Sequence, residues 1–346
     1  MRVGLIRGER KLELLELPAP TPEPGKAVVE IARCGICGTD VHAYAYGGPY
    51  SPAICGHEWA GQVSACGAGV EGVHEGDRVA IGIAPACGRC ALCRAGAPAQ
   101  CTTVLASMLG LDAMAPPHGG FASAVAVDAR RLYRLRPEID DAEAALLEPA
   151  TVVTHALRRT PIRADAPAVV LGAGPIGLLA LQLARAGGAA QVVVIEPEPS
   201  RAALARRLGA AEVFEPEDAA LESKLREVCG KAGPELVLEC AGVPTTIQRS
   251  VELVRRGGRV GLVGLAPAPA TIEPATWLAN EVSLVASLGY THEEFEITQQ
   301  LACDGSLDLA PLVTDTVGLG GLEAAIERLM KPSGEIKILV DPSRET

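Results

Sequence analysis

The stretch Val169-Val-Leu-Gly-Ala-Gly-Pro-Ile-Gly177 decides the fold of this 346-residue chain. Its apolar start predicts a buried strand, and the apolar run 178–186 that follows predicts a helix. A strand, a G-x-G-x-x-G turn and a helix in this order predict a βαβ unit that binds a dinucleotide, since the N–H groups at the helix start attract a pyrophosphate. The candidate cofactor-binding residues of this turn are Gly172, Gly174, Pro175, Ile176 and Gly177.

The next apolar run, 192–195, ends at an acidic residue, Glu196. A carboxylate at the end of the second strand accepts hydrogen bonds from the adenosine ribose hydroxyls. It also repels a 2′-phosphate, so we expect NAD rather than NADP as the cofactor.

The pattern of apolar residues changes along the chain. Between about residues 167 and 263, apolar strand-like runs alternate with helix-like runs, which is typical of a doubly wound parallel sheet. The first 150 residues read as short β segments between glycines, and the chain returns to mixed character after about residue 290. We therefore predict an α/β protein with a β-rich domain at 1–151 and 289–346 and an inserted Rossmann domain at 152–288.

Charge and composition exclude several classes of partner. The formal net charge is −11, from 42 acidic and 31 basic residues, so nucleic acid and anionic membranes are not expected to bind. The N-terminus lacks the apolar core of a signal peptide, and we expect a cytoplasmic protein without a membrane span. In that compartment the 11 cysteines are expected to bind metal or be buried rather than form disulfides.

Four cysteines, Cys87, Cys90, Cys93 and Cys101, follow the pattern C-x2-C-x2-C-x7-C. Four thiolates complete a tetrahedral zinc shell and leave no open position, so this zinc is expected to be structural. An iron–sulfur cluster is the alternative, but its fourth cysteine comes sooner and precedes proline, whereas Cys101 precedes Thr102.

A second group of potential metal ligands lies upstream. Cys37 is followed by His57 and Glu58, which offer a thiolate, an imidazole and a carboxylate. Three protein ligands leave a position open for substrate, which is the arrangement of a catalytic zinc. Taken alone, Cys37 is more often a small buried hydrophobe and His57 a hydrogen-bonded core histidine.

The ordered set of motifs resembles the zinc-containing medium-chain alcohol dehydrogenase superfamily, with its GroES-like and Rossmann domains. The motifs are C-G-T-D-x-H at 37–42, G-H-E at 56–58, G-D-R-V at 76–79, the four cysteines, G-G-F-A at 119–122 and the glycine turn. They are collinear over essentially the whole chain.

The resemblance implies roles for the matching residues. Cys37 and His57 would bind the catalytic zinc, with Glu58 as a further or exchanging ligand. Thr39 would take the alcohol proton and His42 would pass it towards solvent, while Asp40 would hold His57 and fix its tautomer. Arg201 matches a position that helps hold the cofactor ribose, although it would also tolerate a phosphate.

Glu148, followed by Pro149, suggests a branch of the superfamily. Typical alcohol dehydrogenases have cysteine there, whereas the polyol, butanediol and threonine dehydrogenase-like branch has Glu-Pro. The resemblance therefore implies that Glu148 binds the zinc or a zinc-bound water. It also implies hydride transfer between a secondary alcohol or polyol, or its ketone, and NAD.

Alternatives remain open at this point. They are a primary alcohol or aminoalcohol substrate, a zinc-free reductase on the same scaffold and a non-catalytic cofactor-binding relative. Two zinc ions per chain, a small-molecule alcohol or ketone, and assembly as a homotetramer or homodimer are expected. Tyr44, Tyr46 and the stretch 108–117 are candidates for lining the substrate pocket.

Overall fold

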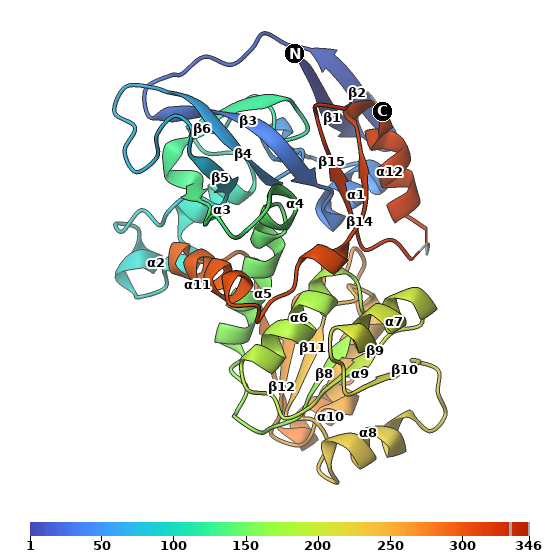
Figure 1. The fold of residues 1–346 in the computed structure, drawn as a ribbon. Coiled ribbons are helices and arrows are strands. Elements are labelled where there is room, and N and C mark those ends of the chain that lie inside the picture. The colour runs from blue at the N-terminus through green and yellow to red at the C-terminus, as the bar shows by residue number, and fades with distance from the viewer. Residues whose placement is uncertain (332–333, 345–346) are drawn as a thin grey trace. The chain divides into compact units, whose positions relative to one another are not determined.

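The computed structural model describes residues 1–331 and 334–344, which form two compact units. The first unit contains Met1–Glu148, Gly289–Cys303 and Val313–Thr346, and the second contains Pro149–Leu288 and Asp304–Leu312 (Figure 1). The segment Asp304–Leu312 was expected in the first unit. It belongs to the second because Asp308 and Gln182 exchange two hydrogen bonds, of 2.7 and 3.0 Å.

The first unit is built on a mostly antiparallel sheet. Within the described residues its strands run in the order β14-β15-β3-β4-β5-β7, with β6 paired to β3, and a separate ribbon pairs β1 with β2. The strands are β1 (Arg2–Gly8), β2 (Lys11–Glu16), β3 (Lys26–Gly35), β4 (Glu58–Cys66), β5 (Arg78–Ile81), β6 (Ala124–Asp128), β7 (Leu132–Arg134), β14 (Val313–Val317) and β15 (Lys337–Val340). The helices are α1 (Gly38–Tyr46), α2 (Ala91–Arg94), α3 (Thr102–Met108), α4 (Asp141–Ala144), α11 (His292–Cys303) and α12 (Leu322–Leu329).

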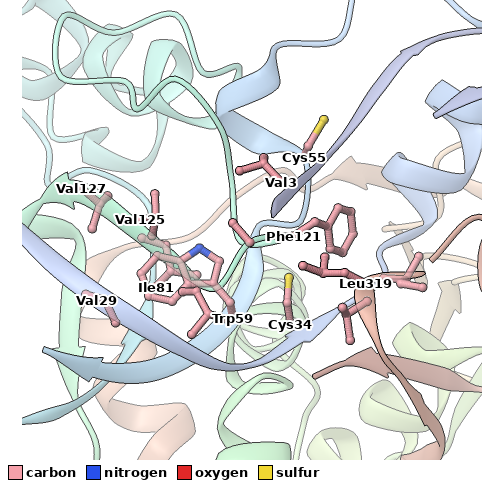
Figure 2. Close-up of a cluster of buried hydrophobic side chains, with 14 of the residues drawn as sticks. Val3, Val29, Cys34, Cys55, Trp59, Ile81, Phe121, Val125, Val127 and Leu319 are labelled. Carbon is pink, nitrogen blue, oxygen red and sulfur yellow. The ribbon is translucent and has the colours of Figure 1, made fainter. Parts of the chain in front are cut away.

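Alternating apolar residues of these strands form the core of the first unit. Figure 2 shows Trp59 and Phe121 among valines from β3 and β6, and all of these side chains are almost fully buried. Gly56 has a φ of 71°, and a Cβ there would lie 2.8 Å from both Cys34 Sγ and Phe121 Cδ1. Only glycine therefore fits at this point, directly before His57.

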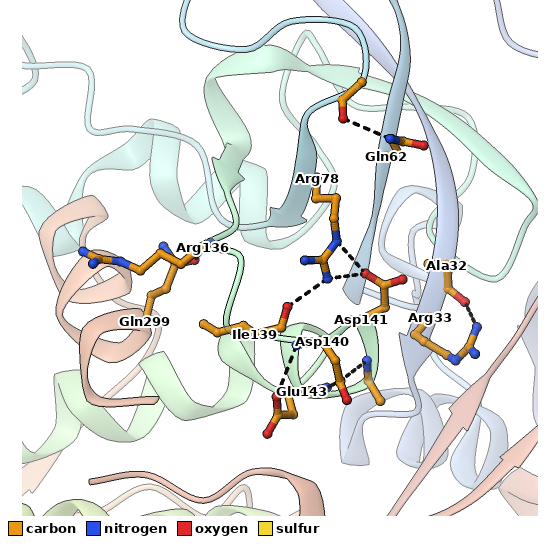
Figure 3. A network of polar contacts seen from close by, with 12 residues as sticks. Ala32, Arg33, Gln62, Arg78, Arg136, Ile139, Asp140, Asp141, Glu143 and Gln299 are labelled. Carbon is orange, nitrogen blue, oxygen red and sulfur yellow. Dashed lines mark hydrogen bonds and ion pairs between the residues drawn. The ribbon is translucent and has the colours of Figure 1, made fainter. Parts of the chain in front are cut away.

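A polar network secures the segment that leads into α5 (Leu147–Arg159) (Figure 3). Arg78 on β5 donates two hydrogen bonds to Asp141 Oδ1, at 3.1 and 2.5 Å, and one to the carbonyl of Ile139. Asp141 is the first residue of α4, and its neighbour Asp140 caps that helix in a capping box with Glu143. The network therefore fixes the chain shortly before Glu148.

The second unit is a parallel sheet of Rossmann topology. Within the described residues its strands run in the order β10-β9-β8-β11-β12-β13, which is the doubly wound order 3-2-1-4-5-6, and all neighbours are parallel. The elements are β8 (Ala168–Leu171), α6 (Pro175–Ala186), β9 (Val192–Ile195), α7 (Pro199–Arg207), β10 (Glu212–Phe214), α8 (Leu221–Cys229), β11 (Leu236–Glu239), α9 (Pro244–Leu253), β12 (Arg259–Leu262), α10 (Pro274–Asn280) and β13 (Ser283–Ala286).

This architecture confirms the predicted α/β class. A β-rich unit is combined with a doubly wound parallel sheet whose first strand, β8, is fully buried. In the part of the chain that the structure describes, no helix combines the length and apolar character that crossing a bilayer requires.

Candidate active site and metal centres

The four predicted cysteine ligands come together in one loop. Among the described residues, Cys87, Cys90, Cys93 and Cys101 are the one group of potential ligands whose donor atoms all lie within 4.8 Å of one another. The sulfurs of Cys90 and Cys101 are 3.9 Å apart, close to the roughly 3.8 Å edge of a tetrahedron with metal–sulfur bonds of about 2.3 Å. The donor set and its spacing therefore fit zinc.

Backbone N–H groups favour the ionised, metal-binding form of two of these sulfurs, those of Cys90 and Cys101, whereas burial and the neighbouring thiols raise the pKa of Cys93 to about 12. The N–H groups of Cys87, Cys90 and Cys93 point at sulfurs of the same loop, at 3.3–3.4 Å. Burial opposes ionisation of Cys101, but its backbone donors outweigh that effect and lower the pKa to about 6. The pKa of Cys90 is likewise lowered to about 7, mainly by the N–H of Cys93.

Cys37 and His57 form the centre of a second site, which we call the Cys37–His57 site together with Glu58 and Glu148. Cys37 is the N-cap of α1, and its sulfur accepts from the N–H of Thr39 at 3.5 Å. His57 Nδ1 lies 2.9 Å from the carbonyl of Ile54, which leaves Nε2 for a metal. Burial acts to lower the pKa of His57, but the nearby Cys37, Asp40 and Glu148 outweigh it and raise the pKa.

Asp40 accepts three hydrogen bonds from groups other than His57. Asp40 is fully buried and accepts from the N–H of Cys37 at 3.0 Å, the hydroxyl of Tyr50 at 2.7 Å and the N–H of Gly56 at 3.1 Å. The role of Asp40 in holding His57 stays a prediction: the two groups interact electrostatically, while Nδ1 of His57 lies 2.9 Å from the Ile54 carbonyl. Asp40 also ties together the two loops that carry Cys37 and His57.

Glu58 is held by a buried lysine. Its Oε2 lies 2.5 Å from Nζ of Lys337, which also donates to the carbonyl of Ile36 at 3.0 Å. Both side chains are at most 3% exposed, and Lys337 is the first residue of β15. Burial acts to lower the pKa of Lys337, but Glu58 and Cys37 outweigh it and raise the pKa. The Glu58 carboxylate is thus engaged in an ion pair next to the potential metal ligands.

Glu148 lies in the first turn of α5 and is close enough to His57 and Glu58 to interact with both electrostatically. Burial raises the pKa of Glu148 to about 7, and His57 opposes that rise. One sulfur, one imidazole nitrogen and one buried carboxylate from three chain segments thus influence one another electrostatically, although their donor atoms do not all lie within 4.8 Å of one another, as those of the four cysteines do. This donor chemistry fits a zinc ion with an open position.

Thr39 and His42 are one turn apart on α1, which places them on the same face of the helix. Oγ1 of Thr39 lies 3.6 Å from the sulfur of Cys37. The pKa of His42 is lowered because the ring is partly buried, so the imidazole is neutral near pH 7 and can accept a proton. Its ring lies edge-on to Tyr46, with centroids 5.9 Å apart.

The glycine turn of the second unit has the shape of a dinucleotide cradle. Gly172 has a φ of 88°, and a Cβ there would lie 2.9 Å from the Cα of Ala241. A Cβ on Gly177 would overlap the carbonyl oxygen of Gly172, whereas a Cβ on Gly174 would meet open space. Gly174 is also the N-cap of α6, with Pro175 at its start. The backbone is therefore open only where a pyrophosphate needs to approach.

Glu196 lies at the end of β9 beside this turn. Its Oε2 accepts from the N–H of Ala173 at 2.5 Å and its Oε1 from the N–H of Glu198 at 2.8 Å. Glu198 in turn caps α7 by accepting from the N–H of Arg201 at 2.8 Å. Two carboxylates therefore lie at the point where the second strand meets its helix.

Comparison with known proteins agrees with both units. Residues 23–137 match the model of the alcohol dehydrogenase GroES-like domain, and residues 175–302 match that of the zinc-binding dehydrogenase domain. The chain is 30% identical to the sorbitol dehydrogenase of Bacillus subtilis (strain 168) over 351 residues, which covers 99% of this chain and 98% of that protein. The chain belongs to the zinc-containing medium-chain alcohol dehydrogenase superfamily.

Other members of the superfamily show the same coverage. The L-threonine 3-dehydrogenase of Streptomyces coelicolor is 32% identical over 341 residues, covering 96% of each chain. The structure of a putative zinc-binding dehydrogenase from Sinorhizobium meliloti 1021, bound to NADP, aligns with a TM-score of 0.87 at 28% identity and 99% coverage of each chain. This member of the superfamily is thus an oxidoreductase of small-molecule alcohols that uses a nicotinamide cofactor.

Sequence reasoning missed two buried residues next to the proposed ligands: Lys337, which pairs with Glu58, and Tyr290, which is 1% exposed and near Glu148. A lysine at the start of a fully buried strand was the available signal for Lys337, while Tyr290 carries no motif. Tyr44 is buried and its hydroxyl donates to Glu323 on α12 at 2.9 Å, and its assignment to the substrate pocket stays a prediction. Tyr46 is 68% exposed.

Proposed function

We propose that this chain is a zinc-dependent dehydrogenase that transfers hydride between a secondary alcohol or polyol, or the corresponding ketone, and NAD. The observation that carries the proposal is the buried Glu148, which lies beside His57 and is followed by Pro149. A carboxylate at this position distinguishes the site from the cysteine-bearing alcohol dehydrogenases. The similarity to a sorbitol dehydrogenase over nearly the whole chain supports the same substrate class.

In this proposal Cys37, His57 and Glu148 hold one zinc ion and the four cysteines hold a second. A zinc ion bound by Cys37, His57 and Glu148 would supply Lewis acidity that lowers the pKa of an alcohol, and a bound nicotinamide would accept the hydride. Thr39 orients the substrate hydroxyl from the start of α1. His42, neutral and on the same helix face, accepts the proton that leaves this hydroxyl.

Preference for NAD rests on the carboxylates at the end of β9. The carboxylates of Glu196, directly after β9, and of Glu198, the N-cap of α7, lie near the glycine turn, and their charges would oppose binding of a 2′-phosphate there. Arg201 reduces this repulsion in part. The proposal predicts a higher kcat/KM with NAD⁺ than with NADP⁺, and Glu196→Ala is expected to narrow that difference.

A second substrate class has its own support. The 32% identity to an L-threonine 3-dehydrogenase favours a vicinal aminoalcohol that bears a carboxylate. Such a substrate requires the same chemistry at the secondary alcohol carbon, so it differs from a polyol only in the groups that the pocket recognises.

The decisive experiment is a substrate panel read by NADH absorbance at 340 nm. It compares sorbitol, xylitol, butane-2,3-diol, L-threonine and propan-2-ol with primary alcohols of the same length, using the zinc-loaded enzyme. The proposal expects secondary alcohols or polyols to lead in kcat/KM. A preference for primary alcohols would contradict it, as would equal rates for wild type and Cys37→Ser.

We further propose that the protein assembles through the edge of the Rossmann sheet. Within the described residues β13 is the outermost strand of that sheet, with only β12 beside it. Leu278 and Leu288, on either side of β13 in sequence, are 81% and 67% exposed. Light scattering after gel filtration is expected to give a dimer or tetramer, and a monomer would contradict this assignment.

A further inference from the structure

Tyr290 is a buried tyrosine whose hydroxyl forms no hydrogen bond with any described residue. The side chain is 1% exposed, and the hydroxyl oxygen is inaccessible to solvent. Buried hydroxyls almost always have a partner, because leaving one without a hydrogen bond destabilises the fold. Such a hydroxyl either gains a partner when a ligand or metal binds nearby, or it destabilises the fold without a compensating role.

The neighbours of this hydroxyl belong to the Cys37–His57 site. Glu148 is close enough that each group shifts the pKa of the other, but their geometry stops short of a formed hydrogen bond. The O–H of Tyr290 is therefore a buried donor without an acceptor, near a carboxylate.

The backbone gives Tyr290 a fixed position. It follows Gly289, whose φ of 70° is accessible to glycine at little cost, and a Cβ at Gly289 would lie 2.8 Å from Met108 Sδ. The Tyr290 ring lies 6.3 Å from that of Phe295 on α11. These contacts limit the freedom of the Tyr290 ring.

We propose that Tyr290 is a positioning residue whose hydroxyl donates a hydrogen bond to Glu148 and turns that carboxylate toward the metal held by Cys37 and His57. The inference rests on the proposed function, since it assigns Glu148 to the zinc. A carboxylate that contributes to a metal site is normally oriented by a hydrogen bond to its second oxygen. The Tyr290 hydroxyl is buried near Glu148 and has no partner among the described residues, so it is available to supply this hydrogen bond.

Tyr133 offers a matched control for this role. It is also a buried tyrosine of the first unit, its hydroxyl also forms no hydrogen bond with the described residues, and its ring stacks on Phe295 at 3.9 Å. Removal of a buried hydroxyl that makes no hydrogen bond is expected to raise the free energy of unfolding or leave it unchanged. Tyr133→Phe is therefore expected to keep the wild-type activity and metal affinity.

The test compares Tyr290→Phe with Tyr133→Phe in the zinc-loaded and cobalt-substituted proteins. For Tyr290→Phe we expect a chelator to remove the metal of the Cys37–His57 site at least about tenfold faster than from wild type. We also expect the visible absorption of the cobalt protein to change. We also expect kcat to fall at least about tenfold with little change in KM. Tyr133→Phe is expected to match wild type in all three measurements.

Two outcomes would overturn the inference. One is an unchanged cobalt spectrum and metal retention in Tyr290→Phe, which would show that the hydroxyl does not act through Glu148. The other is a rise in KM alone, which would make Tyr290 a substrate contact.

Glu148→Gln completes a double-mutant cycle with Tyr290→Phe. If Tyr290 acts through Glu148, the double variant is expected to be no worse than Glu148→Gln alone, and additive losses would contradict the inference. Failure of the proposed function can be told apart from failure of this inference. It would appear in the wild-type protein itself, as the absence of metal in the Cys37–His57 site or of secondary-alcohol turnover.

Discussion

The two proposed metal centres differ in how they are assembled. The four-cysteine loop draws all its ligands from residues 87–101, and their donor atoms already lie within 4.8 Å of one another. The Cys37–His57 site takes its residues from the start of α1, the loop before β4, β4 itself and α5, and one of its carboxylates is paired with Lys337. One centre is pre-formed, and the other keeps part of its ligand set engaged elsewhere.

The difference corresponds to the two kinds of chemistry expected of zinc. Three of the four cysteines are only partly buried, and Cys101 alone among them is buried. A closed thiolate shell would stabilise such a loop, because the loop has little apolar core of its own. A catalytic site has to exchange ligands, and a carboxylate that can alternate between a lysine and a metal allows such exchange. The following predictions test this contrast, from the largest expected effect to the smallest.

Cys37→Ser or His57→Ala is expected to lower the rate of NAD reduction by about 10³-fold or more, because the Lewis acid is lost. The protein should remain folded by circular dichroism, and zinc analysis should show the loss of about one ion per chain. Cys66→Ser changes a thiol outside both centres and should retain full activity. Appreciable turnover by Cys37→Ser would remove the distinction between the two centres.

Cys101→Ser is expected to act on stability. Cys101 is fully buried, and its loss breaks the closed shell, which should cost roughly 4–5 kcal/mol of unfolding free energy, at the upper end for a single substitution. Urea unfolding with and without a chelator measures this effect. If the chelator leaves the wild-type transition unchanged, the four-cysteine loop is not a structural metal centre.

Lys337→Met is expected to leave Glu58 as a buried, unpaired charge and to destabilise the metal-free protein by about 3 kcal/mol. Zinc should narrow this difference, because the freed carboxylate gains a new cationic partner. The double variant Glu58→Gln/Lys337→Met provides the control and should recover most of the loss. A destabilisation that zinc does not reduce would show that Glu58 never reaches the metal.

Asp141→Asn is expected to have the smallest effect. The Arg78–Asp141 pair shown in Figure 3 is 34% and 41% exposed, so breaking it should cost under about 1 kcal/mol. Metal content and kcat should stay at wild-type values. A larger loss of activity would mean that the anchor before α5 controls the placement of Glu148.

The local motifs allowed much of the fold to be predicted from the sequence. Gly172, Gly174 and Gly177 each meet a distinct backbone requirement, so their spacing alone specified the strand, turn and helix. The clustering of the four cysteines could also be predicted from the sequence, because all four lie within one short segment.

The features that could not be predicted depend on long-range packing. Lys337 and Glu58 are separated by 279 positions, and no local pattern relates them. Asp40 matches a motif, but its hydrogen bonds depend on how Tyr50 and Gly56 fold back over it. Tyr290 becomes notable only when its burial and its neighbour Glu148 are known.

The pairing of Lys337 with Glu58 also has a consequence for biosynthesis. The four-cysteine loop can capture zinc as soon as residues 87–101 have left the ribosome. The Cys37–His57 site, in contrast, contains a buried acidic side chain whose counter-ion is made 279 residues later. A nascent chain therefore carries an unbalanced charge in this region until β15 adds to the sheet beside β3, and order in this region is expected to appear late in translation.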